Sequence, residues 1–240
     1  MQFTQCDRLK ASLDELRPIE QKHLPQIRAF WQVALAYSSN ALEGSTLTES
    51  ETKVILEEGL TVSGKPLREH MEALGHRDAL AFLFTVYQQG YTEATIRELH
   101  QLFFHRIDQG EAGRYRRENV LITGTNYLPP KHVQVPDLMA KFGSSHSPSW
   151  HPIEHAAMAH TELVNIHPFL DGNGRTARLL MNLILLRAGY PIALIPPIYR
   201  ARYIEATKAG NKGDSIPFLG LLSQVAEQSL RDYLRLLEGL

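Results

Sequence analysis

The residue types best suited to chemistry in this sequence are gathered in one stretch, HPFLDGNGRTAR, at positions 167–178. It combines a histidine, a carboxylate, two glycines and two arginines directly before a strongly apolar helical segment. Gly172 and Gly174 allow positive φ angles and a close approach of the backbone to a ligand. The residues after them begin a helix, whose free N–H groups and positive dipole end attract an anion. The pattern therefore predicts a phosphate-binding loop.

The two arginines of this stretch strengthen that prediction. Arg175 and Arg178 are three residues apart, so they share one face of the expected helix. Each cation at a helix N-terminus is unfavourable by about 0.3–1 kcal/mol, which an anion would offset. Forked guanidinium groups suit phosphate oxygens. A solvated helix end with two surface arginines explains either residue alone, but it does not explain the whole cluster.

Asp171 and His167 complete the expected chemistry. Asp171 would repel a phosphate unless a cation lay between them, and Mg²⁺ typically takes one or two carboxylates plus phosphate oxygens. We therefore expect Asp171 to hold Mg²⁺, with a turn-forming role as the alternative. His167 ends the preceding helix, where an imidazole can accept a proton from a hydroxyl group. Core packing or helix capping would explain a lone histidine; beside a phosphate loop, a general base is favoured.

The composition indicates one ordinary globular domain. The chain has 240 residues and a formal net charge of −1, so it lacks the basic excess that binds nucleic acids or anionic membranes. Cys6 is the single cysteine, which is typical of a reducing compartment. The N-terminus has no apolar signal core, and the longest apolar run, 179–186, is too short to span a bilayer. We expect a cytoplasmic protein with neither nucleic-acid nor membrane partners.

The spacing of apolar residues predicts helices nearly throughout. Thr48 and Glu51 form a capping box at the start of one of them. Residues 113–133 differ, because NVLI has strand character and TGTNY and PP are typical of turns. The expected fold is all-α with one β-hairpin. The expected helices cover residues 4–16, 24–43, 48–58, 66–88, 92–106, 136–142, 152–166, 175–188, 199–211 and 216–237.

The stretch HPFLDGNGRTAR resembles the signature of the Fic family at every position: histidine-x-phenylalanine-x-acid-glycine-asparagine-glycine-arginine-x-x-arginine. SSNALEGSTLT, GRYR with NVLITG, HPIEHAAMAH and RAGYP also resemble Fic segments, in the family's order. The resemblance covers roughly residues 27–237. It implies a mostly helical domain that transfers AMP from ATP to a Tyr, Thr or Ser hydroxyl group of a target protein.

The same resemblance assigns roles to the residues of the loop. His167 would activate the target hydroxyl, and Asp171 would hold Mg²⁺. Asn173 and the loop amides would hold the α- and β-phosphates, while Arg175 and Arg178 would contact the β- and γ-phosphates. The nucleotide contacts expected here are Asp171, Gly172, Asn173, Gly174, Arg175, Thr176 and Arg178.

Two other segments are expected to border the nucleotide. Residues 120–123 resemble the family's flap, and an exposed strand edge there can align an extended target segment; a purely structural hairpin is the alternative. KAGNKGD resembles a segment that contacts adenine, which makes Asn211 a candidate. Tyr203 would flank the same pocket, with core packing as an equal alternative. The flap residues are Val120, Leu121, Ile122 and Thr123.

The segment SSNALEG, residues 38–44, places Glu43 at the C-terminal end of a predicted helix, where a carboxylate is unfavourable. A solvated helix end would tolerate it. The segment resembles the family's inhibitory motif at Ser39 and Glu43, which implies that Glu43 pairs with Arg178 in place of the γ-phosphate. We therefore predict a weakly active protein that Glu43→Gly activates. A role for Glu43 in removing AMP stays open.

Three further expectations follow from the resemblance. The chain divides into a helical extension (1–26), an inhibitory helix region (27–64) and a catalytic core (65–240). GLTVSGKPLREH, which includes Leu67, resembles a dimer-contact segment and suggests a homodimer. The alternatives to AMP transfer are AMP removal or both reactions, transfer of phosphate or phosphocholine by the same fold, and a nucleotide-binding regulatory module with little turnover.

Overall fold

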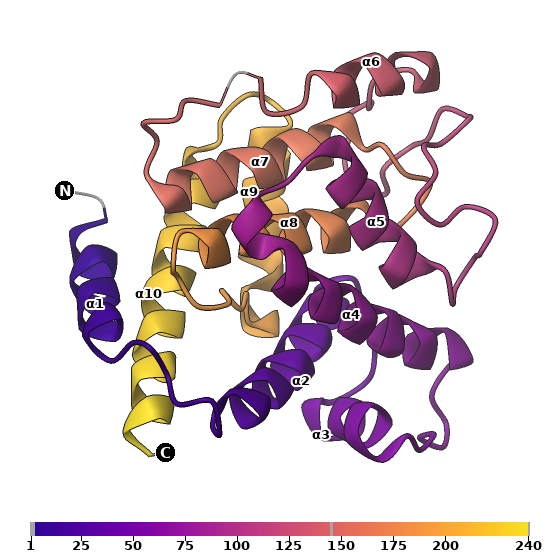
Figure 1. Ribbon diagram of the computed structural model, residues 1–240. Helices are drawn as coiled ribbons and strands as arrows, with labels where there is room; N and C mark the ends of the chain where they lie inside the picture. The colour runs from indigo at the N-terminus through magenta and orange to yellow at the C-terminus, as the bar shows by residue number, and fades with distance from the viewer. Residues whose placement is uncertain (1–2, 145, 240) are drawn as a thin grey trace.

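The computed structural model describes residues 3–144 and 146–239, and over these residues it is helical without a β-strand (Figure 1). The prediction of an all-α fold is confirmed, and each expected helix is found close to its expected ends. The α-helices are α1 (Thr4–Glu15), α2 (Leu24–Leu42), α3 (Glu49–Lys53), α4 (Leu67–Val86), α5 (Glu93–Phe104), α6 (Val135–Ala140), α7 (Pro152–Ile166), α8 (Asn173–Arg187), α9 (Arg200–Gly210) and α10 (Ile216–Glu238). Shorter helical turns are η1 (Val54–Glu58), η2 (Tyr87–Gln89), η3 (His132–Gln134) and η4 (Pro197–Tyr199).

The helix α8 lies in the middle of the molecule, with α7 along it and α4, α5, α9 and α10 around the pair (Figure 1). Its side chains Leu179, Leu180 and Leu183 are fully buried in the main apolar core. Because α8 is surrounded by other helices, its polar N-terminal residues are fixed by packing further along the same helix. The residues that could do chemistry therefore stand on a rigid support.

The predicted β-hairpin is wrong. Residues 113–131 form turns and irregular backbone, η3 begins at His132, and no strand is present among the described residues. Side chains join the two arms of this segment in place of a backbone ladder: Asn119 accepts a hydrogen bond from the backbone N–H of His132, and Arg116 donates to the carbonyls of Glu118 and Pro130. The strand propensity of NVLI is thus overridden by side chain–backbone bonds.

Glu43 and the two ends of the loop at residues 167–172 all lie at the ends of helices. Glu43 caps α2, and Gly44 follows with a φ of 101°, which ends the helix. His167 caps α7 with a φ of 51° and is the sole non-glycine residue with positive φ in the described chain. Gly172 precedes α8 with a φ of 78°. Thr48 caps α3 through the predicted capping box with Glu51.

The first two helices share the main core with the rest of the chain, through Cys6, Leu13 and Trp31 among others. A smaller apolar cluster of Leu47, Ile55 and Ala73 joins the α3–η1 region to α4. The expected division at residues 26 and 64 stays a prediction; residues 1, 2, 145 and 240 of its segments lie outside the described residues. None of the described helices combines the length and apolar character that a bilayer crossing requires.

Candidate active site

The loop between α7 and α8 is held closed by Asn173. Its side chain accepts a hydrogen bond from the backbone N–H of Phe169 and donates one to the carbonyl of the same residue, both at 2.9 Å. Thr176 likewise donates to the carbonyl of Gly172 at 3.0 Å. The side chains of Asn173 and Thr176 therefore shape the loop in this structure, and their expected nucleotide contacts stay predictions.

His100 of α5 supports the same loop and was not identified from the sequence. Its Nδ1 accepts a hydrogen bond from the N–H of Gly113, so Nε2 carries the proton and donates to the carbonyl of Asp171 at 3.0 Å. Its ring stacks on Phe169 with a centroid distance of 3.8 Å. Burial lowers the pKa of His100 to about 4, so the ring stays neutral near neutral pH. A helical sequence such as ELHQLFF gives no sign of this role.

Arg116 links the loop to the irregular segment that replaces the expected hairpin. Its Nε donates to the carbonyl of His167 at 2.8 Å, and its backbone N–H donates to the carbonyl of Pro168. The remaining guanidinium nitrogens donate to Glu118 and Pro130, and the residue is only 2% exposed. One buried side chain thus fixes the backbone of His167 and both arms of the segment above it. In the sequence, Arg116 ends the GRYR motif, which resembles a Fic segment but does not by itself indicate this role.

The imidazole of His167 borders a cavity and is half-buried. Burial lowers its pKa to about 4, against an opposing effect of the carbonyl of Val164. The ring is therefore neutral near neutral pH, which is the form that can accept a proton. The general-base role expected for His167 stays a prediction.

Asp171 and Arg175 belong to a group of four charges completed by two residues of α4. Arg175 lies 2.8 Å from Glu72 and 3.4 Å from Asp171. Arg68 contacts both carboxylates, at 3.1 Å from Glu72 and 2.5 Å from Asp171. Burial alone would raise the pKa of Asp171, but Arg175, the N–H of Gly172 and Arg68 together lower it below its ordinary value. Arg68 and Glu72 were not identified from the sequence.

Arg178 is 2% exposed, and four hydrogen bonds hold its guanidinium. It donates to the side chain and the carbonyl of Ser39, both at 2.9 Å, and to Glu43 at 2.7 Å. It also donates to the hydroxyl of Tyr203 at 2.8 Å, and that hydroxyl lies 3.1 Å from Nε2 of His160. The structure thus brings together Ser39, Glu43 and Arg178, as the inhibitory motif predicts.

The carboxylate of Glu43 lies against the first turn of α8. A Cβ atom added to Gly174 would come within 2.5 Å of Oε1 of Glu43, so only glycine allows this approach. Burial would raise the pKa of Glu43, but the guanidinium of Arg178 and then that of Arg175 lower it. A carboxylate anion therefore occupies the N-terminus of α8, where the sequence predicts a phosphate.

A cavity of about 540 Å³ opens beside this carboxylate, a size typical of small-molecule sites. Val120 and Leu121 do not line it, and Leu121 is 82% exposed. Asn211 lines the cavity, and its side-chain Oδ1 is buried without a hydrogen-bond partner among the described residues. The predicted residues that line the cavity are Glu43, Ile122, Thr123, His167, Gly174, Tyr203 and Asn211.

Comparisons with known proteins find one family throughout. Residues 90–185 match the family model described as the Fic/DOC family. A curated relative from Drosophila ananassae, named protein adenylyltransferase Fic, is 41% identical over 204 residues. The match covers 82% of this chain and 41% of the relative, so the chain spans about two fifths of that protein's length.

Two solved structures are similar over almost the whole chain. A segment of Fic-1 from C. elegans, residues 134–508 of that protein, is 32% identical with a TM-score of 0.86, covering 99% of this chain and 72% of that one. A Fic-domain-containing signaling protein from Bacteroides thetaiotaomicron is 27% identical with a TM-score of 0.87. That match covers 98% of this chain and 97% of the other.

Proposed function

The chain belongs to the Fic/DOC family, and on this premise we propose that it transfers AMP from ATP to a Tyr, Thr or Ser hydroxyl group of a target protein. The name of the curated relatives supports the proposal. The strongest support is the position of the Glu43 carboxylate, which pairs with Arg178 at the N-terminus of α8. This carboxylate borders a ligand-sized cavity that His167 also lines.

The reaction needs one base and one anion-binding helix end. The target hydroxyl oxygen forms a bond to the α-phosphorus of ATP, and the bond from that phosphorus to the pyrophosphate breaks. Neutral His167 accepts the hydroxyl proton. The amides of Gly172 and Gly174, Arg175 and Arg178 stabilise the charge on the phosphates. Positioning and charge neutralisation supply most of the catalysis in such transfers.

Asp171 is the residue that fits Mg²⁺. Its carboxylate is 48% exposed. Among the described residues, no three or more His, Cys, Asp or Glu side chains are grouped so that they could hold a metal ion by themselves. A single carboxylate with phosphate oxygens is a donor set that Mg²⁺ accepts. When bound, the ion would neutralise phosphate charge. Arg68 holds Asp171 in this structure, so the ion and Arg68 compete for it.

The irregular segment above the cavity fits the binding of an extended target peptide. Ile122 and Thr123 line the cavity, whereas Val120 and Leu121 do not, and Leu121 is exposed. Residues 120–123 make no backbone–backbone hydrogen bond with any part of the described chain. Their free N–H and C=O groups are available to a strand of the target, in the manner of β-augmentation.

We propose that Glu43 inhibits the transfer. Its carboxylate holds Arg178, which the γ-phosphate would otherwise contact. Removal of AMP from a modified target is the second candidate activity, because Glu43 is 38% exposed and lines the same cavity as His167. A carboxylate in that position can orient a water molecule towards a bound phosphoester.

A homodimer is a further part of the proposal. Leu60 and Leu67, which belong to the segment that resembles a dimer contact, are 57% and 67% exposed. Exposed apolar side chains on one short segment favour a protein contact. Light scattering of the wild type and of a Leu60→Ser, Leu67→Ser variant tests this part separately from catalysis.

Labelled ATP distinguishes the candidate reactions. Glu43→Gly is incubated with a cell lysate, Mg²⁺ and ATP labelled at either the α- or the γ-phosphate. We expect protein-bound label from α-labelled ATP and none from γ-labelled ATP. Label from γ-labelled ATP alone would show phosphate transfer, and transfer from CDP-choline would show phosphocholine transfer. No label from any donor, with nucleotide binding intact, would favour a regulatory module.

A further inference from the structure

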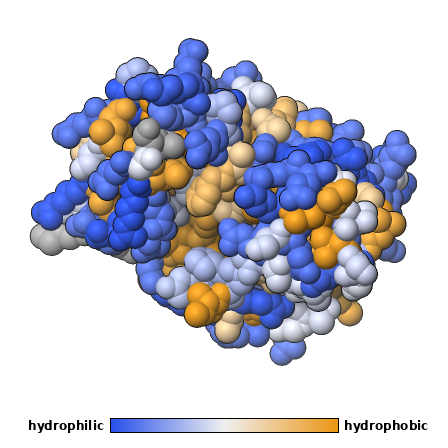
Figure 2. All heavy atoms as spheres, turned by 90° about the horizontal axis from the view of Figure 1, so that it is seen from below, coloured by the Kyte–Doolittle hydropathy of each residue, from blue (hydrophilic) through white to orange (hydrophobic). Residues whose placement is uncertain are grey.

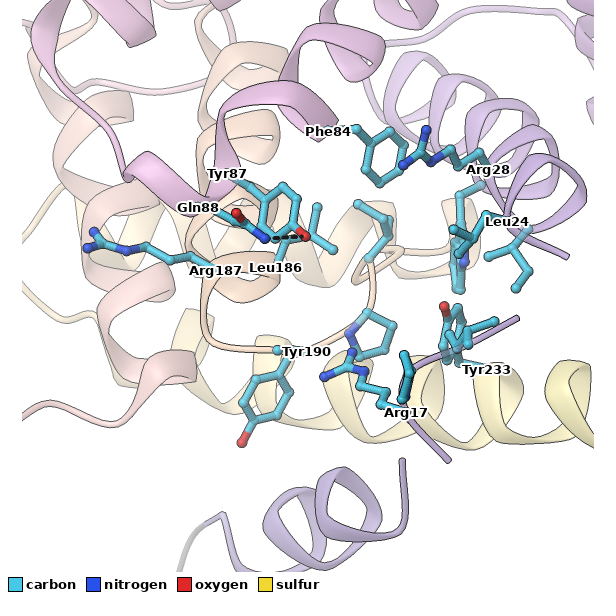
Figure 3. A pocket seen from close by; sticks show the side chains of 17 residues that line it. Arg17, Leu24, Arg28, Phe84, Tyr87, Gln88, Leu186, Arg187, Tyr190 and Tyr233 are labelled. Carbon is cyan, nitrogen blue, oxygen red and sulfur yellow. Dashed lines mark hydrogen bonds between the residues drawn. The ribbon is translucent and has the colours of Figure 1, made fainter. Parts of the chain in front are cut away.

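A second, larger cavity of about 770 Å³ shares no lining residue with the candidate nucleotide cavity. The segment between α1 and α2, the first half of α2, the end of α4 with η2, and the end of α8 with the loop after it enclose this cavity (Figure 3). Figure 2 looks at the molecule from below and shows apolar atoms in a hollow between two hydrophilic lobes. The volume falls within the range of sites that bind small molecules.

The wall of this cavity is mostly apolar and aromatic. Leu24, Ile27 and Trp31 come from α2, and Leu186 comes from α8. Tyr233 of α10 lines it as well and stacks on Trp31 with a centroid distance of 5.9 Å. Such a wall accepts an apolar or aromatic body, because its burial removes apolar surface from water.

The charged groups on this wall are all positive: Arg17, Arg28 and Arg187 line the cavity, and no carboxylate does. Arg28 lies 5.5 Å from the ring centre of Phe84 and has no ion pair in the described chain. Arg17 and Lys10 both pair with Asp14, so this group of two cations and one carboxylate keeps a net charge of +1. In Figure 3, Arg17 and Arg28 approach from opposite sides, whereas Arg187 extends away.

We propose that this cavity is a binding site for a small amphipathic anion, with an apolar or aromatic body and one anionic head group. The body fills the space lined by α2 and α8, and the head group pairs with Arg28 or Arg17. Arg17 and Arg28 are solvent-exposed at the edge of this apolar wall, so a head group can pair with them while the body is buried against the apolar side chains. The wall favours an anion over a cation because it holds no carboxylate.

Two fluorescent probes that differ in one charge test the proposal on the purified full chain. Anilinonaphthalene sulfonate has the anionic group, and phenylnaphthylamine has the same aromatic body without it; both brighten in apolar surroundings. We expect saturable binding of the sulfonate. The Arg17→Gln, Arg28→Gln double variant should weaken it about tenfold and change the binding of the neutral probe less than about twofold.

Two further variants control for surface charge and for folding. The Arg8→Gln, Arg202→Gln variant removes two exposed arginines that do not line the cavity, and it should leave both probes unaffected. Leu24→Trp places a larger side chain in the cavity and should weaken both probes, with a cooperative thermal transition showing that the chain still folds. Equal losses of sulfonate binding in the two double variants would overturn the proposal. Unchanged binding of both probes to Leu24→Trp would overturn it as well.

Discussion

The carboxylate of Glu43 contacts the guanidinium of Arg178 at 2.7 Å, although 135 residues separate them in the sequence. The same carboxylate lies against Gly174 at the start of α8. Glu43, at the end of α2, thus places a carboxylate at the N-terminus of α8, which is the end of a helix that binds phosphate. Under the proposed function, Glu43 and the γ-phosphate of ATP compete for one guanidinium. The position of α2 then determines whether ATP can be bound productively.

Glu43→Gln should give a protein of intermediate activity. The amide keeps the shape of the side chain and can still accept a hydrogen bond from Arg178, but it loses the ionic attraction. We expect AMP transfer faster than in the wild type and slower than in Glu43→Gly, measured as initial rates with α-labelled ATP. Glu49→Gln, on the exposed start of α3, serves as the control. A rate equal to that of the wild type would show that charge is not the inhibitory feature.

Arg116→Lys should slow catalysis without weakening ATP binding. Lysine cannot reach the carbonyls of His167, Glu118 and Pro130 at once, and each buried carbonyl left unpaired costs about 1–3 kcal/mol of stability. In the Glu43→Gly background we expect kcat to fall about tenfold or more with the KM for ATP unchanged.

Arg117→Lys is the matched control for Arg116→Lys, because Arg117 is 72% exposed and, among the described residues, forms an ion pair only with Glu111. Thermal unfolding of both variants separates a loss of stability from a loss of positioning. If kcat and stability respond equally to the two substitutions, Arg116 does not position His167.

The pH dependence of AMP transfer should reflect a base with a low pKa. His167 has a pKa of about 4, so it stays neutral as the pH falls through the ordinary histidine value of 6.5. Glu43 raises this pKa, so its removal in Glu43→Gly lowers the pKa further. We expect kcat/KM, which reports the pKa of the free enzyme, to show no loss from protonation of His167 between about pH 8 and 6 and to decline from that cause only as pH 4 is approached. A midpoint near the ordinary histidine value in the kcat/KM profile of folded protein would contradict this.

Arg68→Gln should make Mg²⁺ easier to load. Arg68 holds the Asp171 carboxylate, and a neutral side chain no longer competes with the ion. We expect the Mg²⁺ concentration that half-saturates binding of a non-hydrolysable ATP analogue to fall by about two- to fivefold, since an exposed ion pair contributes up to about 1 kcal/mol. Arg106→Gln breaks a comparable ion pair with Asp78 and should have no effect. An unchanged or higher Mg²⁺ requirement in Arg68→Gln would contradict the competition.

The sequence predicted the helices because their apolar spacing and end signals are local, as the capping box of Thr48 and Glu51 shows. It also predicted the Glu43–Arg178 pair, through a family resemblance rather than through physics. It missed His100, Arg116 and Arg68, whose contacts with the loop span 71, 51 and 103 residues. Such contacts depend on how helices pack, which no local pattern records.

The absence of the expected hairpin has a physical cause as well. NVLI has strand propensity, yet Arg116 and Asn119 join the arms of its segment through side chains, so no ladder forms. The side chain of Asn173 binds both the N–H and the carbonyl of Phe169, and its expected contact with a phosphate stays a prediction. In both places, polar side chains form hydrogen bonds with backbone groups, and the sequence alone did not predict these bonds.

The most direct test of the proposed function and its inhibition compares three proteins: wild type, Glu43→Gly, and Glu43→Gly with His167→Ala. Each is incubated with α-labelled ATP and Mg²⁺, and label on protein is measured over time. We expect label to appear at least about tenfold faster in Glu43→Gly than in the wild type, and none above background in the double variant. Equal rates in wild type and Glu43→Gly, or full activity without His167, would contradict it.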